Sequence, residues 1–280
     1  MDPFGLVRVS VADVRRGPDH RSEQVTQAIM GTMVSVLSRR PAKWLRVQLP
    51  DGYKGYIHKG LIQPGSGRQA RRWTRQADIL VTVPWTMIYS RRSSRSDPVS
   101  DAVIGTRLCR IEESALWIRV RLPDDRQGWL ARHETTRGLH LIHPEGGRRQ
   151  DIIRLAGRFL GIPYLWGGLT PKGFDCSGFT QTVFGLNGYP LPRDAYQQFR
   201  CGQKISSRED LAPADLLFFQ GSGARRITHV AIHLARERFI HCSNLVRTNS
   251  LNPSASGYDV TLEQNYVGAR RIVGGKDGTC

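Results

Sequence analysis

The stretch Phe174-Asp175-Cys176-Ser177-Gly178-Phe179 places a cysteine at the predicted start of an amphipathic helix. Asp175 is a favourable N-cap residue, and apolar residues recur along one face of the segment that follows. A cysteine in the first turn of a helix lies at the positive end of the macrodipole, which favours the nucleophilic thiolate. Backbone N–H groups at the same helix start could hold the oxyanion of a tetrahedral intermediate. The stretch therefore makes Cys176 a candidate nucleophile.

Segments on both sides of this stretch predict an α+β fold. Upstream, apolar residues from Ile152 to Leu160 follow helical spacing and stop at Gly161-Ile162-Pro163, which predicts one helix with a sharp end. Downstream, residues 215–219, 227–234 and 238–242 read as strands. Helix first and antiparallel strands afterwards is typical of the α+β class.

Two histidines on the predicted strands are candidates for the catalytic base. His229 lies in an otherwise apolar strand, and His241 lies on the next one. A hairpin between them puts both rings on one face if the register has the right parity. His241 would then orient His229, as the third member of a Cys-His triad does. His233 would share the face of His229, and the sequence alone leaves it as an alternative.

Each of these residues also has a purely structural interpretation. A single cysteine is more often a small buried hydrophobic residue, and a single strand histidine is more often one that is satisfied within the fold. A mixed Cys/His metal site is a further alternative, but the spacing matches no familiar zinc pattern. We therefore expect neither a metal nor a cofactor.

The first half of the chain contains an internal repeat. Residues 44–51, Trp-Leu-Arg-Val-Gln-Leu-Pro-Asp, reappear 73 positions later at 117–124 as Trp-Ile-Arg-Val-Arg-Leu-Pro-Asp. The alternation of apolar and polar residues followed by Pro-Asp predicts a β-hairpin in each copy. Gly31-Thr32 and Gly105-Thr106 predict a turn before each hairpin. We expect two small all-β units, separated by a linker at residues 63–69.

Six short motifs occur in series in the second half of the chain. They are Tyr164-Leu165-Trp166-Gly167-Gly168, Phe174-Asp175-Cys176-Ser177-Gly178-Phe179, Leu191-Pro192-Arg193-Asp194, Ala214-Asp215-Leu216-Leu217-Phe218-Phe219, Thr228-His229-Val230-Ala231-Ile232 and Phe239-Ile240-His241. This series resembles the NlpC/P60 family of cell-wall peptidases, and the two β units resemble bacterial SH3-type barrels. The resemblance implies barrels at residues 1–66 and 76–142 and a papain-like catalytic domain at residues 143–280.

The resemblance also implies roles for individual residues. Cys176 attacks, His229 acts as general base and then acid, and His241 orients His229. Tyr164 lies near the oxyanion. Further residues beside the nucleophile are expected to contact substrate: Trp166, Asp175 and Ser177.

The family cleaves the peptide bond after γ-D-glutamate and before a diamino acid such as meso-diaminopimelate or lysine. Two barrels before this domain resemble the γ-D-glutamyl-L-diamino acid endopeptidases that recycle murein peptides, in which the first barrel closes the site around a free N-terminal L-Ala. Asp194 matches the family acid that binds this amine. Glu23 is the expected second acid, and Tyr53 or Tyr56 the expected aromatic residue.

The formal net charge is +17, from 41 Lys and Arg against 24 Asp and Glu, so an anionic wall polymer is a candidate partner. The basic residues are scattered and accompany no RNA-binding or helix-turn-helix pattern, so nucleic-acid binding is not favoured. No run of about 18 apolar residues occurs, and we expect no membrane span. The amino terminus lacks the pattern of a signal peptide, which predicts a cytoplasmic protein.

Two other functions stay open at the level of sequence. The chain would be a secreted hydrolase of intact peptidoglycan if a signal peptide had been removed, and the positive charge agrees with that alternative. It would be a wall-binding module if its catalytic domain were inactive. Retention of Cys176, His229 and His241 together argues against an inactive domain.

Overall fold

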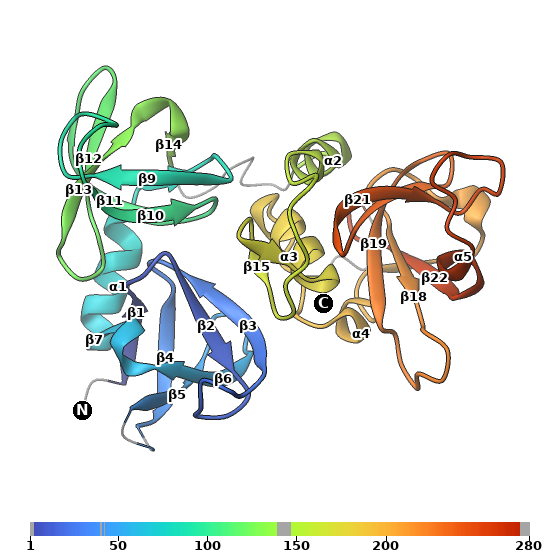
Figure 1. Ribbon diagram of the computed structural model, residues 1–280, viewed down its shortest axis with the longest axis horizontal. Coiled ribbons are helices and arrows are strands. Elements are labelled where there is room, and N and C mark those ends of the chain that lie inside the picture. Colours follow the sequence, from blue (N-terminus) through green and yellow to red (C-terminus); the bar gives the residue numbers. More distant parts are fainter. Residues whose placement is uncertain (1–2, 40, 42, 139–146, 275–280) are drawn as a thin grey trace. The chain divides into compact units, whose positions relative to one another are not determined.

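The computed structural model describes residues 3–39, 41, 43–138 and 147–274 of the 280 (Figure 1). The chain divides into two compact units, residues 1–141 and 142–280. The domain boundary predicted near residue 142 lies outside the described residues. Within the described part, no helix is long and apolar enough to cross a membrane.

The first unit begins with a seven-stranded sheet. Its strands are β1 (Phe4–Val7), β2 (Val11–Arg15), β3 (Gln24–Ile29), β4 (Met33–Ser38), β5 (Trp44–Gln48), β6 (Lys54–His58) and β7 (Ile62–Gly65). They are ordered β3-β2-β6-β5-β4-β1-β7, and the alternating side chains of these strands bury an aliphatic core. The hairpin predicted from the repeat is β5–β6, with Trp44 opposite His58.

A second seven-stranded sheet repeats this arrangement. Its strands are β8 (Ile79–Val81), β9 (Trp85–Tyr89), β10 (Pro98–Val103), β11 (Arg107–Glu113), β12 (Trp117–Arg121), β13 (Gln127–Ala131) and β14 (Thr135–Arg137). Their order, β10-β9-β13-β12-β11-β8-β14, is that of the first sheet with every strand number raised by seven. Gly31 and Gly105 have φ angles of 83° and 86° at the predicted turns. The internal sequence repeat therefore corresponds to two sheets with the same strand order.

The prediction of a linker at residues 63–69 is wrong. Residues 63–65 belong to β7, and helix α1 (Gly67–Gln76) starts directly after Ser66. Ser66 and Gln69 form a capping box, in which the Ser66 N–H donates to Gln69 Oε1 over 2.8 Å. The Ser-x-x-Gln spacing was the signal for this helix, although the Gly- and Pro-rich composition indicated a linker.

The second unit combines helices and short strands with one larger sheet. Its elements are α2 (Arg149–Gly157), β15 (Leu169–Thr170), β16 (Gly173–Phe174), α3 (Cys176–Leu186), α4 (Ala195–Gln198), β17 (Gln203–Ile205), β18 (Leu216–Phe219), β19 (His229–Ala235), β20 (Arg238–Ser243), β21 (Leu245–Ser250), α5 (Val260–Gln264) and β22 (Tyr266–Arg271). The six-stranded antiparallel sheet has the order β17-β22-β18-β19-β20-β21, and α3 packs against β19 and β20. The predicted α+β fold is confirmed.

Predicted and observed elements in this unit differ mainly at their ends. Helix α2 ends at Gly157, because residues 158–161 form turns instead of continuing to Leu160. Strands β18, β19 and β20 each lie within two residues of the predicted segments. Three phenylalanine rings, those of Phe159, Phe174 and Phe179, pack together with centroids 5.1–6.4 Å apart and anchor the start of α3.

Candidate active site

Helix α3 starts at Cys176, as the sequence predicts. Asp175 is the N-cap residue, with extended backbone angles, and its Oδ1 accepts a hydrogen bond of 2.6 Å from the Gly178 N–H. Cys176 thus occupies the first helical position with a side chain that is buried, since the residue is 8% exposed. The capped start of α3 therefore determines the position of the Cys176 thiol within the second unit.

A buried arginine holds this helix start in place through hydrogen bonds. Arg193, 3% exposed, donates from one nitrogen to Asp175 Oδ1 and Ser177 Oγ, each over 3.0 Å. Its second terminal nitrogen donates to Asp175 Oδ2. Asp175 Oδ2 also accepts from the Gly167 N–H over 3.0 Å. The polar groups of Asp175 and Ser177 are therefore directed into the protein, which does not support the substrate contacts expected for them.

A glycine in the first turn lets the helix approach the preceding loop. A Cβ atom on Gly178 would lie 2.0 Å from the carbonyl oxygen of Gly168, and one on Gly168 would lie 2.3 Å from the carbonyl oxygen of Gly173. Neither backbone position accepts a side chain without moving. The Gly-Gly and Cys-Ser-Gly motifs of the sequence are thus two sides of one close backbone contact.

The thiol of Cys176 faces the strand that carries the candidate base. Its Sγ lies 3.9 Å from the carbonyl oxygen of Thr228, the residue before His229. Burial, followed by the nearby Asp175 carboxylate, raises the pKa of Cys176 to about 12, against the opposing effect of backbone N–H groups at Val230 and Ser177. Burial therefore acts against the thiolate that the helix start is expected to favour. With its pKa raised in this way, Cys176 is expected to be a thiol at neutral pH.

The two candidate histidines form a hydrogen-bonded pair. His229 Nε2 and His241 Nδ1 are 2.8 Å apart, and their rings stand at 84° with centroids 5.0 Å apart. The β19–β20 register pairs Ile232 with Ile240, so residues 229 and 241 share a face of the sheet. The sequence left open whether the two rings lie on the same face of the sheet, and in this register they do. Since Nε2 of His229 is engaged, its Nδ1 is the nitrogen left for the thiol.

His233 takes no part in this arrangement. It lies four residues from His229 on β19, which corresponds to about 13 Å along a strand. Its side chain is buried, and Nδ1 lies 2.9 Å from the carbonyl oxygen of Ala212. This alternative base is a satisfied structural residue.

Burial keeps both histidines of the pair neutral at physiological pH. It lowers the pKa of His229 to about 3, with a further contribution from His241. It also lowers the pKa of His241 to about 4, partly opposed by the hydrogen bond that the His241 ring donates to Asn249 Oδ1. His241 Nε2 lies 3.1 Å from Asn249 Oδ1, which extends the series of side chains from β19 across β20 to β21. Neither Asn249 nor Arg193 was predicted to belong to the site.

Tyr164 lies close to the nucleophile in this unit. Its backbone N–H donates to the carbonyl oxygen of Asn244 over 2.7 Å, and burial, followed by the charge of Cys176, raises the pKa of its hydroxyl. The hydroxyl therefore stays protonated and can donate a hydrogen bond. Trp166 is 62% exposed on the same loop.

Asp194 lies at the start of α4, next to the buried Arg193. It is half-buried, and burial raises the pKa of its carboxyl group, with Arg193 and Arg226 opposing that rise. The other residues expected to bind the substrate amine belong to the first unit. Glu23 pairs with Arg16 over 2.8 Å beside β3, Tyr53 packs against the first core, and Tyr56 lies on β6. Their part in the site stays a prediction.

No group of three or more His, Cys, Asp or Glu side chains suited to a metal ion occurs among the residues that the structure describes. The groups near Cys176 are instead backbone N–H groups and a tyrosine hydroxyl, and the neighbouring strands carry two imidazoles. These groups can take up a proton from a thiol and stabilise an oxyanion, which is the chemistry of acyl transfer.

Comparison with known proteins identifies the peptidases to which this chain is similar. The profile described as the NlpC/P60 family matches residues 161–270, and that described as the bacterial dipeptidyl-peptidase Sh3 domain matches residues 14–60. A gamma-D-glutamyl-L-lysine dipeptidyl-peptidase of Bacillus cereus is 30% identical over 260 residues, which cover 89% of this chain and 75% of the relative. Dipeptidyl-peptidase 6 of Lysinibacillus sphaericus is 25% identical over 262 residues, covering 88% of this chain and 91% of the relative.

The fold has a close counterpart among solved structures. The crystal structure of an NlpC/P60 family protein from Bacillus cereus superimposes with a TM-score of 0.80 at 26% sequence identity. The match covers 96% of this chain and 99% of that one. It therefore extends over both units and includes the second sheet.

Proposed function

Because the chain belongs to the NlpC/P60 family, we propose that it is a cysteine peptidase that hydrolyses the bond between γ-D-glutamate and an L-diamino acid in murein peptides. The diamino acid is lysine or meso-diaminopimelate. The observation that carries this proposal is the hydrogen-bonded pair of His229 and His241 on the strands beside Cys176. The similarity to gamma-D-glutamyl-L-lysine dipeptidyl-peptidases supports the choice of bond.

The proposed reaction starts from a neutral thiol and a neutral imidazole. As the sulfur of Cys176 attacks the γ-carbonyl carbon of the D-glutamyl residue, its proton passes to His229 Nδ1. The N–H of Cys176 and the Tyr164 hydroxyl donate to the oxyanion. Collapse breaks the peptide bond, and the imidazolium of His229 returns the proton to the leaving amine. Water, deprotonated by His229, then hydrolyses the thioester and restores the thiol.

The raised pKa of Cys176 fits this order of events. A thiol that ionises only while it attacks does not need a stable ion pair in the resting enzyme. The positive charge that then develops on His229 is stabilised through its hydrogen bond to His241. We propose that the proton transfer and the attack are coupled in a single step.

We further propose that the enzyme requires a free N-terminal L-Ala on its substrate. The carboxyl group of Asp194, half-buried next to the nucleophile helix, is the proposed partner of the ammonium group. Glu23 and either Tyr53 or Tyr56 are proposed to complete the recognition. Such a requirement suits released murein peptides, and the cytoplasm is the compartment that we propose for the enzyme.

Product analysis by mass spectrometry tests this function. The substrates are L-Ala-γ-D-Glu-L-Lys, its meso-diaminopimelate analogue, and the N-acetylated form of each. Release of L-Ala-γ-D-Glu from the free peptides alone is expected, with loss of activity in Asp194→Asn but not in the exposed control Asp125→Asn. Equal cleavage of free and acetylated peptides, together with release of peptides from intact sacculi, would favour a secreted wall hydrolase. Binding to sacculi without any product would favour an inactive wall-binding module.

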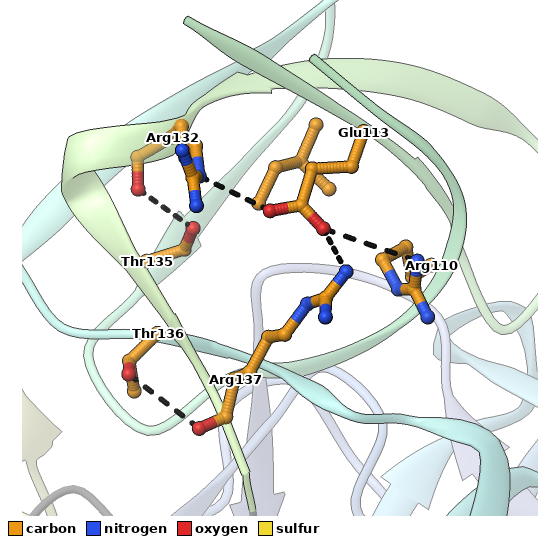
Figure 2. A pocket seen from close by; sticks show the side chains of 7 residues that line it. Arg110, Glu113, Arg132, Thr135, Thr136 and Arg137 are labelled. Carbon is orange, nitrogen blue, oxygen red and sulfur yellow. Dashed lines mark hydrogen bonds and ion pairs between the residues drawn. The ribbon is translucent and has the colours of Figure 1, made fainter. Parts of the chain in front are cut away.

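A basic cavity on the second sheet is the proposed contact for an anionic wall polymer. The cavity has a volume of about 620 Å³, and three arginines, Arg110, Arg132 and Arg137, converge there on Glu113 (Figure 2). Arg132 Nε lies 3.1 Å from Glu113, and Arg110 also pairs with Asp78 over 3.4 Å. These guanidinium groups outnumber the carboxylates that they contact, and they are between 38% and 57% exposed. Unused N–H donors at such a place suit phosphate or carboxylate groups.

Sedimentation with purified sacculi tests this contact. The double variant Arg132→Ala/Arg137→Ala is expected to bind less than the parent at low salt and to show a weaker dependence on salt. The matched control is Arg71→Ala/Arg75→Ala, which removes the same charge from helix α1. Equal loss in both double variants would mean that only the net charge matters.

We also propose that the second sheet is an SH3-type domain, because it has the same strand order as the first sheet.

A further inference from the structure

The two histidines of the site are followed by a third polar side chain on the next strand. Asn249 lies on β21, and the β20–β21 register places it opposite Phe239 and diagonal to His241. Its Oδ1 is 3.1 Å from His241 Nε2. Three neighbouring strands thus contribute one side chain each to a continuous series, His229, His241 and Asn249.

The orientation of the Asn249 amide follows from its other contacts. Its Nδ2 donates to the carbonyl oxygen of Gly257 over 3.2 Å and to Asp259 Oδ2 over 3.5 Å. Both partners are acceptors only, so a flipped amide would place its oxygen against two other oxygens. Asp259 itself is held at the start of α5, where its Oδ1 accepts from the Leu262 N–H over 3.0 Å. The amide oxygen is therefore the group presented to His241.

This orientation determines where the protons lie on both rings. An amide oxygen can only accept, so His241 Nε2 must carry a proton. A neutral His241 then has a bare Nδ1, which must accept from a protonated Nε2 of His229 over 2.8 Å. A neutral His229 in turn has a bare Nδ1. That nitrogen is the one that receives the proton of Cys176 in the proposed reaction.

We propose that Asn249 is a positioning residue that sets the tautomers of His241 and His229 and so keeps Nδ1 of His229 free to accept the proton of the nucleophile. This inference rests on the proposed function for its kinetic consequence. Without the amide oxygen, His241 can carry its proton on Nδ1 and donate it to His229. His229 would then hold its own proton on Nδ1, facing the thiol, and the proton transfer would be blocked.

The packing around the pair leaves the rings few other arrangements. Phe219 lies 5.7 Å from His229, and Phe239 lies 5.1 Å from His241, measured between ring centroids. Both phenylalanines are buried, so water has little access to the hydrogen bonds of the rings. A buried ring nitrogen that lost its partner would not be satisfied by solvent, and the tautomer equilibrium would respond to that loss.

The test compares Asn249→Leu, Asn249→Asp/Asp259→Asn and the control Thr248→Ala, the neighbouring β21 residue on the other face. Nitrogen NMR of protein labelled with ¹⁵N in histidine reports the tautomers without substrate. The parent at pH 7 is expected to show His229 and His241 protonated on Nε2, and Asn249→Leu to lose this state. For the γ-D-glutamyl peptide we expect kcat to fall about 10- to 100-fold in Asn249→Leu with little change in KM. Asn249→Asp, combined with Asp259→Asn so that two carboxylates do not face each other, keeps the acceptor oxygen toward His241 and should retain more activity than Asn249→Leu.

Two results would overturn the inference. One is a parent in which His241 is protonated on Nδ1, and the other is a folded Asn249→Leu whose tautomers and kcat match those of Thr248→Ala. If Asn249→Leu does not fold, the parent spectrum and the activity of Asn249→Asp/Asp259→Asn still decide the matter. A parent with the expected tautomers that does not cleave the peptide would instead contradict the proposed function and leave the role of Asn249 intact.

Discussion

Replacing Arg193 by methionine is expected to destabilise the second unit by about 3–5 kcal/mol, because it leaves the buried carboxylate of Asp175 without its partner. Arg193 donates two hydrogen bonds to Asp175 and one to Ser177, and both charged residues are less than 10% exposed. The pair of Arg154 and Asp151 gives a comparison in the same unit, since Asp151 is buried like Asp175 but the Arg154 side chain is 70% exposed. Arg154→Met is expected to cost less than about 1 kcal/mol.

Urea unfolding at pH 7, read by amide hydrogen exchange at Gly178 and Phe179, measures both variants locally at the start of α3. The double variant Arg193→Met/Asp175→Asn removes both charges and is expected to lose less than the sum of the single variants, by about 1–3 kcal/mol. Two results would contradict this expectation. One is a free energy of unfolding that falls equally in Arg193→Met and Arg154→Met, and the other is a double variant whose loss equals the sum of the losses in Arg193→Met and Asp175→Asn. Either result would mean that this ion pair does not hold the nucleophile helix.

The remaining predictions concern the same unit. A pH of 5 should destabilise the parent by about 4 kcal/mol relative to pH 7, about 2 kcal/mol for each histidine of the pair, because an unfolded histidine binds a proton below about pH 6.5, whereas burial lowers the pKa of His229 to about 3 and that of His241 to about 4. His241→Gln should remove about half of this pH dependence in urea unfolding, and an unchanged slope would contradict it. Gly178→Ala should lower the melting temperature, because the new Cβ would lie 2.0 Å from the Gly168 carbonyl oxygen, at a cost of about 2–3 kcal/mol. Gly185→Ala on the same helix meets nothing within 4 Å and should raise the melting temperature; similar shifts in both would refute the packing argument.

Local sequence signals predicted the elements that carry the site. Asp175 before Cys176 marked the helix start, and the apolar strands around His229 and His241 marked the two positions that the sheet brings together. Such features follow from residues within one turn or one hairpin. The similarity of the two N-terminal β units was equally accessible, because the repeat of residues 44–51 at 117–124 is visible in the sequence, whereas their strand order was not.

Other features depend on contacts between distant segments or on burial. Arg193 lies in a Pro-Arg-Asp turn, where an arginine is usually exposed, and only the fold shows that it reaches Asp175. Asn249 lies on a strand with no distinctive motif, and its contact with His241 depends on the β20–β21 register. The raised pKa of Cys176 depends on burial, which a helix N-cap in the sequence does not report.

The central claim is that Cys176 is the nucleophile, and the most direct measurement compares two buried thiols. Cys242 is also buried, with its Sγ 3.1 Å from the carbonyl oxygen of Phe174, and has no part in the proposed reaction. Hydrolysis of L-Ala-γ-D-Glu-L-Lys should fall by at least about 10⁴-fold in Cys176→Ala and by less than about tenfold in Cys242→Ala. Retained hydrolysis in a folded Cys176→Ala, or its loss in a folded Cys242→Ala alone, would contradict the account.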